Sequence, residues 1–194
     1  MSTARMIAKD ALAVVHRART SRDIVITTMT PARDWMQLGM CDLDMVLVPS
    51  AMGHATSMGL GLALAQPDRR VIVCNGDGSM LMNLGSLVSI VNAGPSNLVV
   101  LVFDNGTYEV TGSQPVPGAG TVDYAAVARG CGFRSVFEFS NDDEWRNDAA
   151  RIIAAEGPTF AWLKIEAVYG VPGPKSPGPA SARARRFMAA IRGA

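Results

Sequence analysis

The chain carries a series of short runs of apolar and β-branched residues, and this pattern constrains its fold more than any other feature. Each run is bounded by polar residues, glycine or proline, and the expected strands are 24–27, 45–48, 71–74, 98–103, 135–139 and 160–165. Most of these runs are apolar throughout, whereas a strand with one solvated face would alternate apolar and polar residues. Uninterrupted apolar strands are typical of a parallel sheet that helices cover on both faces.

Helical segments separate these runs. The expected helices are 2–19, with Ser2 or Thr3 as its N-cap, then 56–65, 80–92, 124–130 and 142–155. Right-handed crossovers place such helices above and below the sheet. We therefore predict an α/β fold, a doubly wound, mostly parallel sheet of about six strands with helices on both faces. Residues 1–168 form this domain, and 169–194 form a Pro-rich arm with a terminal helix over 183–191.

Composition narrows the classes of partner. At 194 residues and 48% hydrophobic residues, the chain fits one domain with a sizeable core. The 18 basic and 17 acidic residues leave a net charge of +1, which gives no footprint for nucleic acid or an anionic membrane. No apolar stretch approaches the ~18 residues of a membrane span, so we expect a soluble protein.

The cysteines and the arginines near the C-terminus give two further expectations. Cys41, Cys74 and Cys131 are far apart and form no CxxC pair, which argues against a disulfide framework or a zinc site and favours a reducing cytoplasm. The last helix carries four arginines, which either contact a partner or form a solvated face: Arg183, Arg185, Arg186 and Arg192.

A glycine-rich turn follows the third expected strand. It reads Asn75-Gly76-Asp77-Gly78-Ser79 and leads directly into a helical segment. The glycines allow a tight turn, and the N–H groups of Gly78 and Ser79 can point at anionic oxygens. Asp77 can hold a divalent cation, so the turn suits a phosphate together with a metal.

A second polar turn, Asp104-Asn105-Gly106-Thr107-Tyr108, follows the next strand. Adjacent parallel strands would bring both turns to one edge, where the Asn105 amide oxygen and a carbonyl near Thr107 can complete the shell of a Mg²⁺ held by Asp77. Taken separately, Asp-Gly and Asn-Gly dipeptides are ordinary turn residues.

Together, GDGS, an apolar helix, a strand and DNGTY closely resemble the signature of thiamine-diphosphate-dependent enzymes. The resemblance implies that Asp77, Asn105 and the Thr107 carbonyl bind Mg²⁺ and that Gly76, Gly78, Ser79 and Tyr108 belong to the cofactor site. Upstream, Pro49-Ser50-Ala51-Met52-Gly53-His54 resembles the family's G-x-M-G loop. It implies that Met52 wedges the cofactor into a bent shape while Ser50 and Ala51 contact the pyrimidine. Ser50 stands where the family usually has glycine.

Longer stretches, among them MGHATSMGLGLALA and DNGTYEVTGSQP, look most like the sulfopyruvate and phosphonopyruvate decarboxylase group. This resemblance implies a decarboxylase for a small 2-oxo acid. Some members of the group split the pyrimidine-binding and diphosphate-binding domains between two subunits, and this chain has one domain only. The resemblance therefore implies a separate pyrimidine-binding subunit and an α2β2 assembly.

The family uses a glutamate at the N1′ atom of the cofactor. The chain has five glutamates, none of which the sequence places for that role: Glu109, Glu138, Glu144, Glu156 and Glu166. We expect the partner to supply this group. His54, directly after the Met52 loop, is a candidate catalytic residue that could contact substrate or relay a proton, or else it caps the next helix. Gln114 lies in a segment that covers the site or is a plain turn.

Three alternatives remain at this point. A nicotinamide-dependent enzyme would share the fold, but no G-x-G-x-x-G follows the first strand. A non-catalytic nucleotide-binding subunit would not need both Asp77 and Asn105. A carboligase resembling acetolactate synthase would use the same cofactor.

Overall fold

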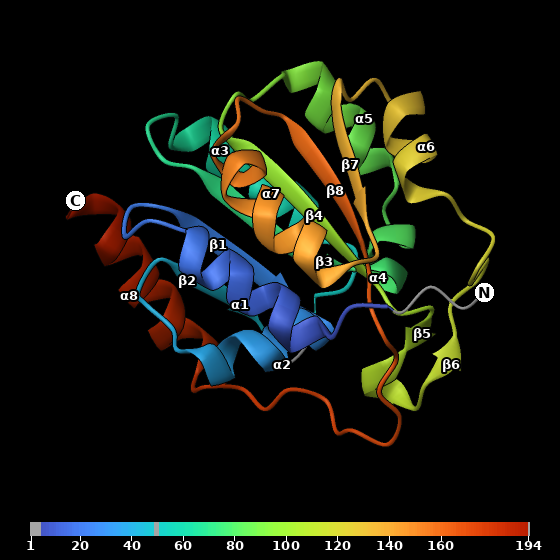
Figure 1. The fold of residues 1–194 in the computed structure, drawn as a ribbon. Helices are drawn as coiled ribbons and strands as arrows, with labels where there is room; N and C mark the ends of the chain where they lie inside the picture. Colours follow the sequence, from blue (N-terminus) through green and yellow to red (C-terminus); the bar gives the residue numbers. More distant parts are fainter. Residues whose placement is uncertain (1–4, 49–50, 194) are drawn as a thin grey trace.

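The apolar runs form one parallel sheet in the computed structural model, which describes residues 5–48 and 51–193. Across the sheet the order is β2-β1-β3-β4-β8-β7, and every neighbouring pair is parallel (Figure 1). The strands are β1 (Ile24–Thr28), β2 (Asp44–Leu47), β3 (Val71–Gly76), β4 (Leu98–Asp104), β7 (Ser135–Phe139) and β8 (Thr159–Lys164). The predicted fold class is confirmed.

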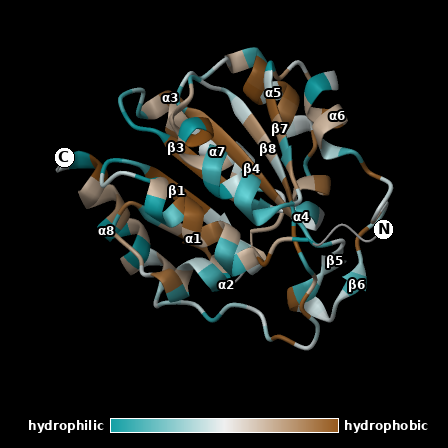
Figure 2. Cartoon of the chain, in the orientation of Figure 1, coloured by the Kyte–Doolittle hydropathy of each residue, from teal (hydrophilic) through white to brown (hydrophobic). Residues whose placement is uncertain are grey.

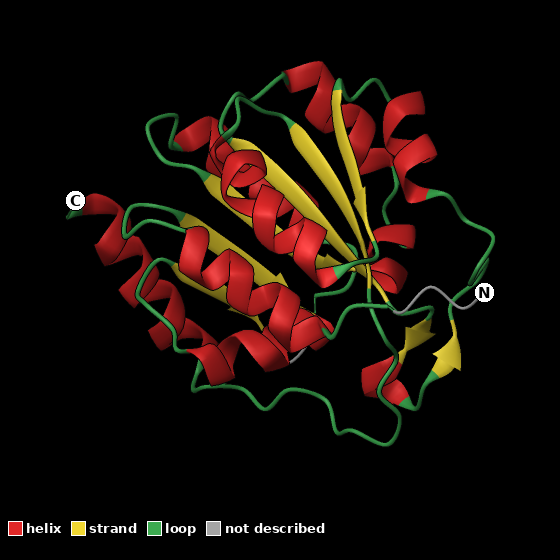
Figure 3. Cartoon of the chain, viewed as in Figure 1, coloured by secondary structure: helices red, strands yellow, loops and turns green. Residues whose placement is uncertain are grey.

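Helices cover both faces of the sheet (Figure 3). On one face lie α1 (Ala8–Ala18), α2 (Met29–Leu38) and α7 (Asp142–Ala154), and on the other α3 (Ala55–Ala65), α4 (Asp77–Leu81), α5 (Gly85–Ala93), α6 (Tyr124–Gly130) and α8 (Ala180–Arg192). Figure 2 shows the central strands as the most hydrophobic part, since β3 and β4 send alternate side chains into the two cores. Within the described ranges, no helix is long and apolar enough to cross a membrane.

The order of the strands creates a switch point at β1. The chain passes from β1 to β2 on one side, and β3 then pairs with β1 on the other side. In open α/β sheets, ligands bind outside the carboxyl ends of the strands where the winding direction reverses. The ends of β1, β3 and β4 therefore mark the place to look for a site.

The observed helices differ from the prediction in three main respects. The first helix begins at Ala8, because Met6 is extended and pairs with Ile165 beside β8; the expected N-cap, Ser2 or Thr3, lies outside the described residues. Helix α2 was not predicted at all. The expected helix 80–92 is two helices, because residues after Leu81 form tight turns before α5 begins at Gly85.

A small hairpin also escaped prediction. Strands β5 (Thr107–Tyr108) and β6 (Gln114–Pro115) pair antiparallel and enclose the 3₁₀ turn η1 (Glu109–Thr111). Gln114 is exposed on this hairpin. The hairpin keeps the second polar turn next to the sheet edge.

The arm over 169–179 runs along one edge of the molecule and ends in α8 beside β2 (Figure 1). Phe187 of α8 is buried in the second core cluster, and Arg183 donates to the carbonyls of Val46 and Val48. The other three arginines of α8 are exposed. Helix α8 therefore packs on its own domain through Phe187 and Arg183.

Alanine substitutions at two glycines of α3 should change the stability of the fold in opposite directions. A Cβ at Gly59 would lie 2.4 Å from Cγ2 of Val73, whereas nothing lies within 4 Å of one at Gly61. We expect Gly59→Ala to lower the free energy of unfolding by ~1–3 kcal/mol through overpacking. Gly61→Ala should raise it by up to ~1 kcal/mol through helix propensity. Urea unfolding of both variants checks the close packing of α3 on β3, and equal effects would contradict it.

Candidate functional site

A hollow lies at the carboxyl ends of β1, β3 and β4. Its lining comes from the segments after these strands and from the loop before α3: Met29, Thr30, Met52, Gly76, Asp77, Gly78, Ser79, Phe103, Asn105, Thr107, Tyr108, Glu109 and Val110. The two turns that were predicted to meet at one edge therefore line the same hollow.

A hydrogen bond joins these two turns directly. The amide N of Gly106 lies 2.9 Å from Oδ2 of Asp77. The β3–β4 pairing brings the two turns together, with Gly76 opposite Phe103 in register. Asp77 is buried at the first turn of α4, and its carboxylate is fixed against the loop that carries Asn105.

Asn105 has a defined orientation on this loop. Its Oδ1 accepts a hydrogen bond from the Thr107 amide at 3.0 Å, and its Nδ2 donates to Oε2 of Glu109 at 2.8 Å. Only 7% of the Asn105 surface is exposed. The amide oxygen is therefore on the side of the Gly106–Thr107 backbone.

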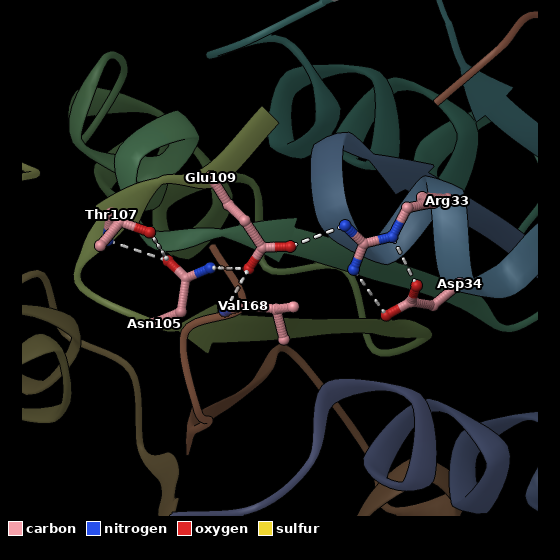
Figure 4. A network of polar contacts seen from close by, with 6 residues as sticks. All are labelled: Arg33, Asp34, Asn105, Thr107, Glu109 and Val168. Carbon is pink, nitrogen blue, oxygen red and sulfur yellow. Dashed lines mark hydrogen bonds and ion pairs between the residues drawn. The ribbon is translucent and has the colours of Figure 1, made fainter. Parts of the chain in front are cut away.

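Glu109 lies behind Asn105 and is held from three directions (Figure 4). Its Oε1 pairs with Nη1 of Arg33 at 2.7 Å, and its Oε2 also accepts from the Val168 amide at 3.3 Å. Arg33 in turn binds Asp34 through Nε at 2.8 Å. This network joins α2, the hairpin turn and the start of the C-terminal arm.

The Met52 loop is tied to the segment after β3. The Gly53 amide donates to Oγ of Ser79 at 3.0 Å, and the Gly53 carbonyl accepts from Nδ2 of Asn83 at 2.9 Å. Gly53 has φ 77°, which favours glycine at this position. These bonds hold Met52 at the wall of the hollow.

Glycine is required at one further position. A Cβ on Gly78 would lie 2.4 Å from Cε1 of Tyr108, so the tyrosine ring packs directly on the backbone of α4. At Gly76, by contrast, no atom lies within 4 Å of the place that a Cβ would take. The turn is therefore closely packed at Gly78 and open at Gly76.

The hollow has an acidic character. Burial raises the pKa of Asp77 to about 8, and the neighbouring Asp104 carboxylate adds to this shift against hydrogen bonds from the Gly78 and Gly106 amides. None of the residues that line the hollow is basic. Beside these carboxylates an anionic ligand is favoured when a cation accompanies it, and a cation would favour the ionised Asp77.

The donors available are those of a hard cation. A carboxylate (Asp77), an amide oxygen (Asn105) and the backbone near Thr107 suit Mg²⁺ or Ca²⁺. Within the described part of the chain, no three His, Cys, Asp or Glu side chains gather into a metal site of their own. The residues thus fit a cation that shares its remaining positions with ligand oxygens.

Some candidates lie outside the hollow. Ser50 is outside the described residues. Ala51 is half-buried and is not part of the lining, and its carbonyl accepts from the His54 amide. His54 is exposed, and its Nδ1 lies 2.8 Å from the carbonyl of Met52, away from the lining.

Other lining residues were not foreseen. Met29 and Thr30 come from α2, whose start could have been found from Pro31 in its first turn and from the apolar positions Ala32 and Trp35. Met29 has φ 58°, a conformation that no sequence signal indicates. The pairing of Arg33 with Glu109 links residues 76 positions apart, so local pattern could not reveal it.

Comparison with known proteins agrees with this geometry. Over residues 29–161 the chain matches the family described as thiamine pyrophosphate enzyme, C-terminal TPP binding domain; thiamine pyrophosphate is thiamine diphosphate. An X-ray structure of a Mycobacterium smegmatis protein assigned to the thiamin diphosphate-dependent enzymes has a TM-score of 0.72, with 19% identity, and the alignment covers 84% of this chain and 32% of that one. This likeness supports the fold alone.

Two named relatives have a higher sequence identity to this chain. The chain is 39% identical over 168 residues to a phosphonopyruvate decarboxylase of Streptomyces viridochromogenes, covering 85% of this chain but only 42% of the relative. It is 37% identical over 160 residues to the sulfopyruvate decarboxylase subunit beta of Methanothermobacter thermautotrophicus, covering 82% of this chain and 76% of that subunit. The chain therefore belongs to the thiamine pyrophosphate enzymes, as a C-terminal TPP-binding domain of the sulfopyruvate and phosphonopyruvate decarboxylase group.

Proposed function

We propose that the chain is the diphosphate-binding subunit of a thiamine-diphosphate- and Mg²⁺-dependent decarboxylase that acts on a small 2-oxo acid, similar to sulfopyruvate or phosphonopyruvate. The observation that carries this proposal is the joining of the Asp77 and Asn105 turns in one hollow by the Gly106–Asp77 hydrogen bond. The names of the relatives support the substrate class.

In this proposal the chain anchors the diphosphate end of the cofactor. Asp77, the Asn105 Oδ1 and the Thr107 carbonyl would hold Mg²⁺, and Gly76, Gly78, Ser79 and Tyr108 would surround the diphosphate. The absence of a basic side chain among the lining residues supports this assignment, because Mg²⁺ would then be the positive charge that binds the diphosphate. Bound thiamine diphosphate would supply the electron sink that a 2-oxo acid needs to lose CO₂.

Met52 would act as the wedge that holds the cofactor bent. Its position in the lining and the two hydrogen bonds that fix Gly53 support this role, because a wedge needs a rigid support. Ser50, Ala51 and His54 remain candidates at the pyrimidine and substrate end, which a second subunit would complete.

The glutamates support the need for a partner. Glu138, Glu144, Glu156 and Glu166 are exposed. Glu109 lines the hollow, but both of its oxygens already accept hydrogen bonds. We therefore propose that a separate pyrimidine-binding subunit supplies the glutamate for N1′, in an α2β2 assembly.

Apolar side chains on α3 and near α5 support a partner on this side of the molecule. Met58, Leu64, Met82 and Val88 are each between 37% and 55% exposed. We propose these exposed apolar side chains as candidates for contact with the partner. The three free cysteines are compatible with the cytoplasm, where we place the enzyme.

Asp77→Ala should abolish retention of the cofactor, because it removes the carboxylate that would hold Mg²⁺. We expect the affinity for thiamine diphosphate with Mg²⁺ to fall by more than the ~10- to 100-fold that is typical of losing an outer-shell partner. Calorimetry on the assembled complex measures this. Asp68→Ala, an exposed carboxylate in the loop before β3, is the matched control, and equal affinities in both variants would refute the metal assignment.

Met52→Ala should affect rate more than binding, because the diphosphate anchor stays intact. We expect kcat to fall about tenfold, or about 1.4 kcal/mol of transition-state stabilisation, with a small change in cofactor affinity. Steady-state kinetics and urea unfolding distinguish this from packing. An unchanged kcat with a loss of ~2–5 kcal/mol in unfolding free energy would mean that Met52 is only a core residue.

The chain by itself should be catalytically silent and should gain activity only with its partner. Without the partner, half of the cofactor would face solvent and the N1′ glutamate would be missing. A CO₂-release assay on sulfopyruvate and phosphonopyruvate, with and without the protein that co-purifies with this chain, checks this, and light scattering gives the assembly. Full activity from the chain alone would overturn the division between two subunits.

A further inference from the structure

The Asn105 amide is held between two partners of opposite chemistry. On one side, the Glu109 carboxylate can only accept hydrogen bonds, and it accepts from Nδ2 at 2.8 Å. On the other side, the Thr107 backbone N–H can only donate, and it donates to Oδ1 at 3.0 Å. A flipped amide would set oxygen against carboxylate and NH₂ against N–H, so only one orientation is favourable.

This orientation is the one that a metal ligand needs. The Oδ1 atom faces the Gly106–Thr107 backbone, and the Gly106 amide is bonded to Asp77. Oδ1 accepts from the Thr107 amide at 3.0 Å and, over a longer 3.5 Å, from the Thr107 hydroxyl, which can rotate away, so one of its two lone pairs can bind a cation. A hard cation takes the oxygen of an amide and not its nitrogen.

Glu109 is itself fixed by a buried ion pair. Its side chain is 1% exposed, that of Arg33 is 14% exposed, and that of Asp34 is 7% exposed. Burying these charges removes them from water, which costs free energy, so a buried ion pair is weak evidence for a stabilising role. The hypothesis that follows is that this ion pair fixes the geometry of its neighbours. Arg33 binds Asp34 and Glu109 at the same time, so the carboxylate that orients Asn105 is anchored to α2 (Figure 4).

We propose that Glu109, anchored by Arg33, is a positioning residue that fixes the Asn105 amide with its oxygen toward the cation of the proposed function, on which this inference rests. Glu109 does not touch the cation in this proposal. It acts through Asn105, as outer-shell groups do when they orient the ligands of a metal. The Val168 amide, which also donates to Glu109, links the same carboxylate to the start of the C-terminal arm.

The test is a double-mutant cycle on metal affinity. The free Mn²⁺ signal in electron paramagnetic resonance reports binding of Mn²⁺ to the assembled complex of this chain and its partner in the presence of thiamine diphosphate, without any need for activity. Glu109→Gln keeps the size of the side chain but cannot accept from both Arg33 and Asn105. We expect Mn²⁺ binding to weaken by ~10- to 100-fold.

The cycle distinguishes positioning from general stability. If Glu109 acts through Asn105, Glu109→Gln should weaken Mn²⁺ binding little further in the Asn105→Ala background. Glu138→Gln, which breaks the exposed Lys164–Glu138 pair on the same sheet, is the control and should bind Mn²⁺ as the unmodified chain does. Wild-type affinity in Glu109→Gln, or an equal loss in both backgrounds, would overturn the proposal.

A second variant covers the case in which Glu109→Gln does not fold. Arg33→Lys keeps the positive charge but loses the planar group that holds Asp34 and Glu109 together. It should lower Mn²⁺ affinity severalfold, and again only when Asn105 is present; an unchanged affinity would contradict the role of the anchor. If the assembled complex with the unmodified chain binds no Mn²⁺, or the complex with Asp77→Ala binds it equally well, the proposed function itself fails, and this inference fails with it.

Discussion

The hydrogen bond from the Gly106 amide to Asp77 joins the two turns on which the rest of the site depends. It can form because β3 and β4 are parallel neighbours in a register that sets Gly76 opposite Phe103. A register shift of one residue would move every strand side chain to the opposite face of a sheet that is buried on both sides. The two cores therefore fix the register, and the register fixes the distance between Asp77 and Asn105.

The carboxylates at the two turns are the reason why we propose an anionic cofactor that binds together with a cation. Asp77 and Glu109 both line the hollow, and the buried carboxylate of Asp104 lies next to that of Asp77. Arg33 does not line the hollow, and its guanidinium is paired with Glu109 and Asp34. Beside these carboxylates a diphosphate is favoured when a cation accompanies it, which is the arrangement that we propose.

The fold could be predicted to a large extent, because continuous apolar runs leave few alternatives to a buried parallel sheet. The failures lie at two places along the chain. Helix α2 begins at Met29, whose positive φ interrupts the passage from strand to helix. The helix predicted over 80–92 is divided by tight turns between Leu81 and Gly85, where Asn83 donates to the Gly53 carbonyl and to Ser57, which are distant in sequence. Neither contact has a counterpart in hydrophobic periodicity.

The sequence by itself determined the fold class, the family and the residues that meet at the strand ends, because these follow from apolar periodicity and from short motifs whose chemistry is local. Only the tertiary structure decided how those residues are held. The orientation of Asn105 depends on Glu109, that of Glu109 on Arg33, and that of Met52 on Ser79 through Gly53. These partners lie on different elements, and a hydrogen bond acts over about 3 Å in space, whatever the separation along the chain.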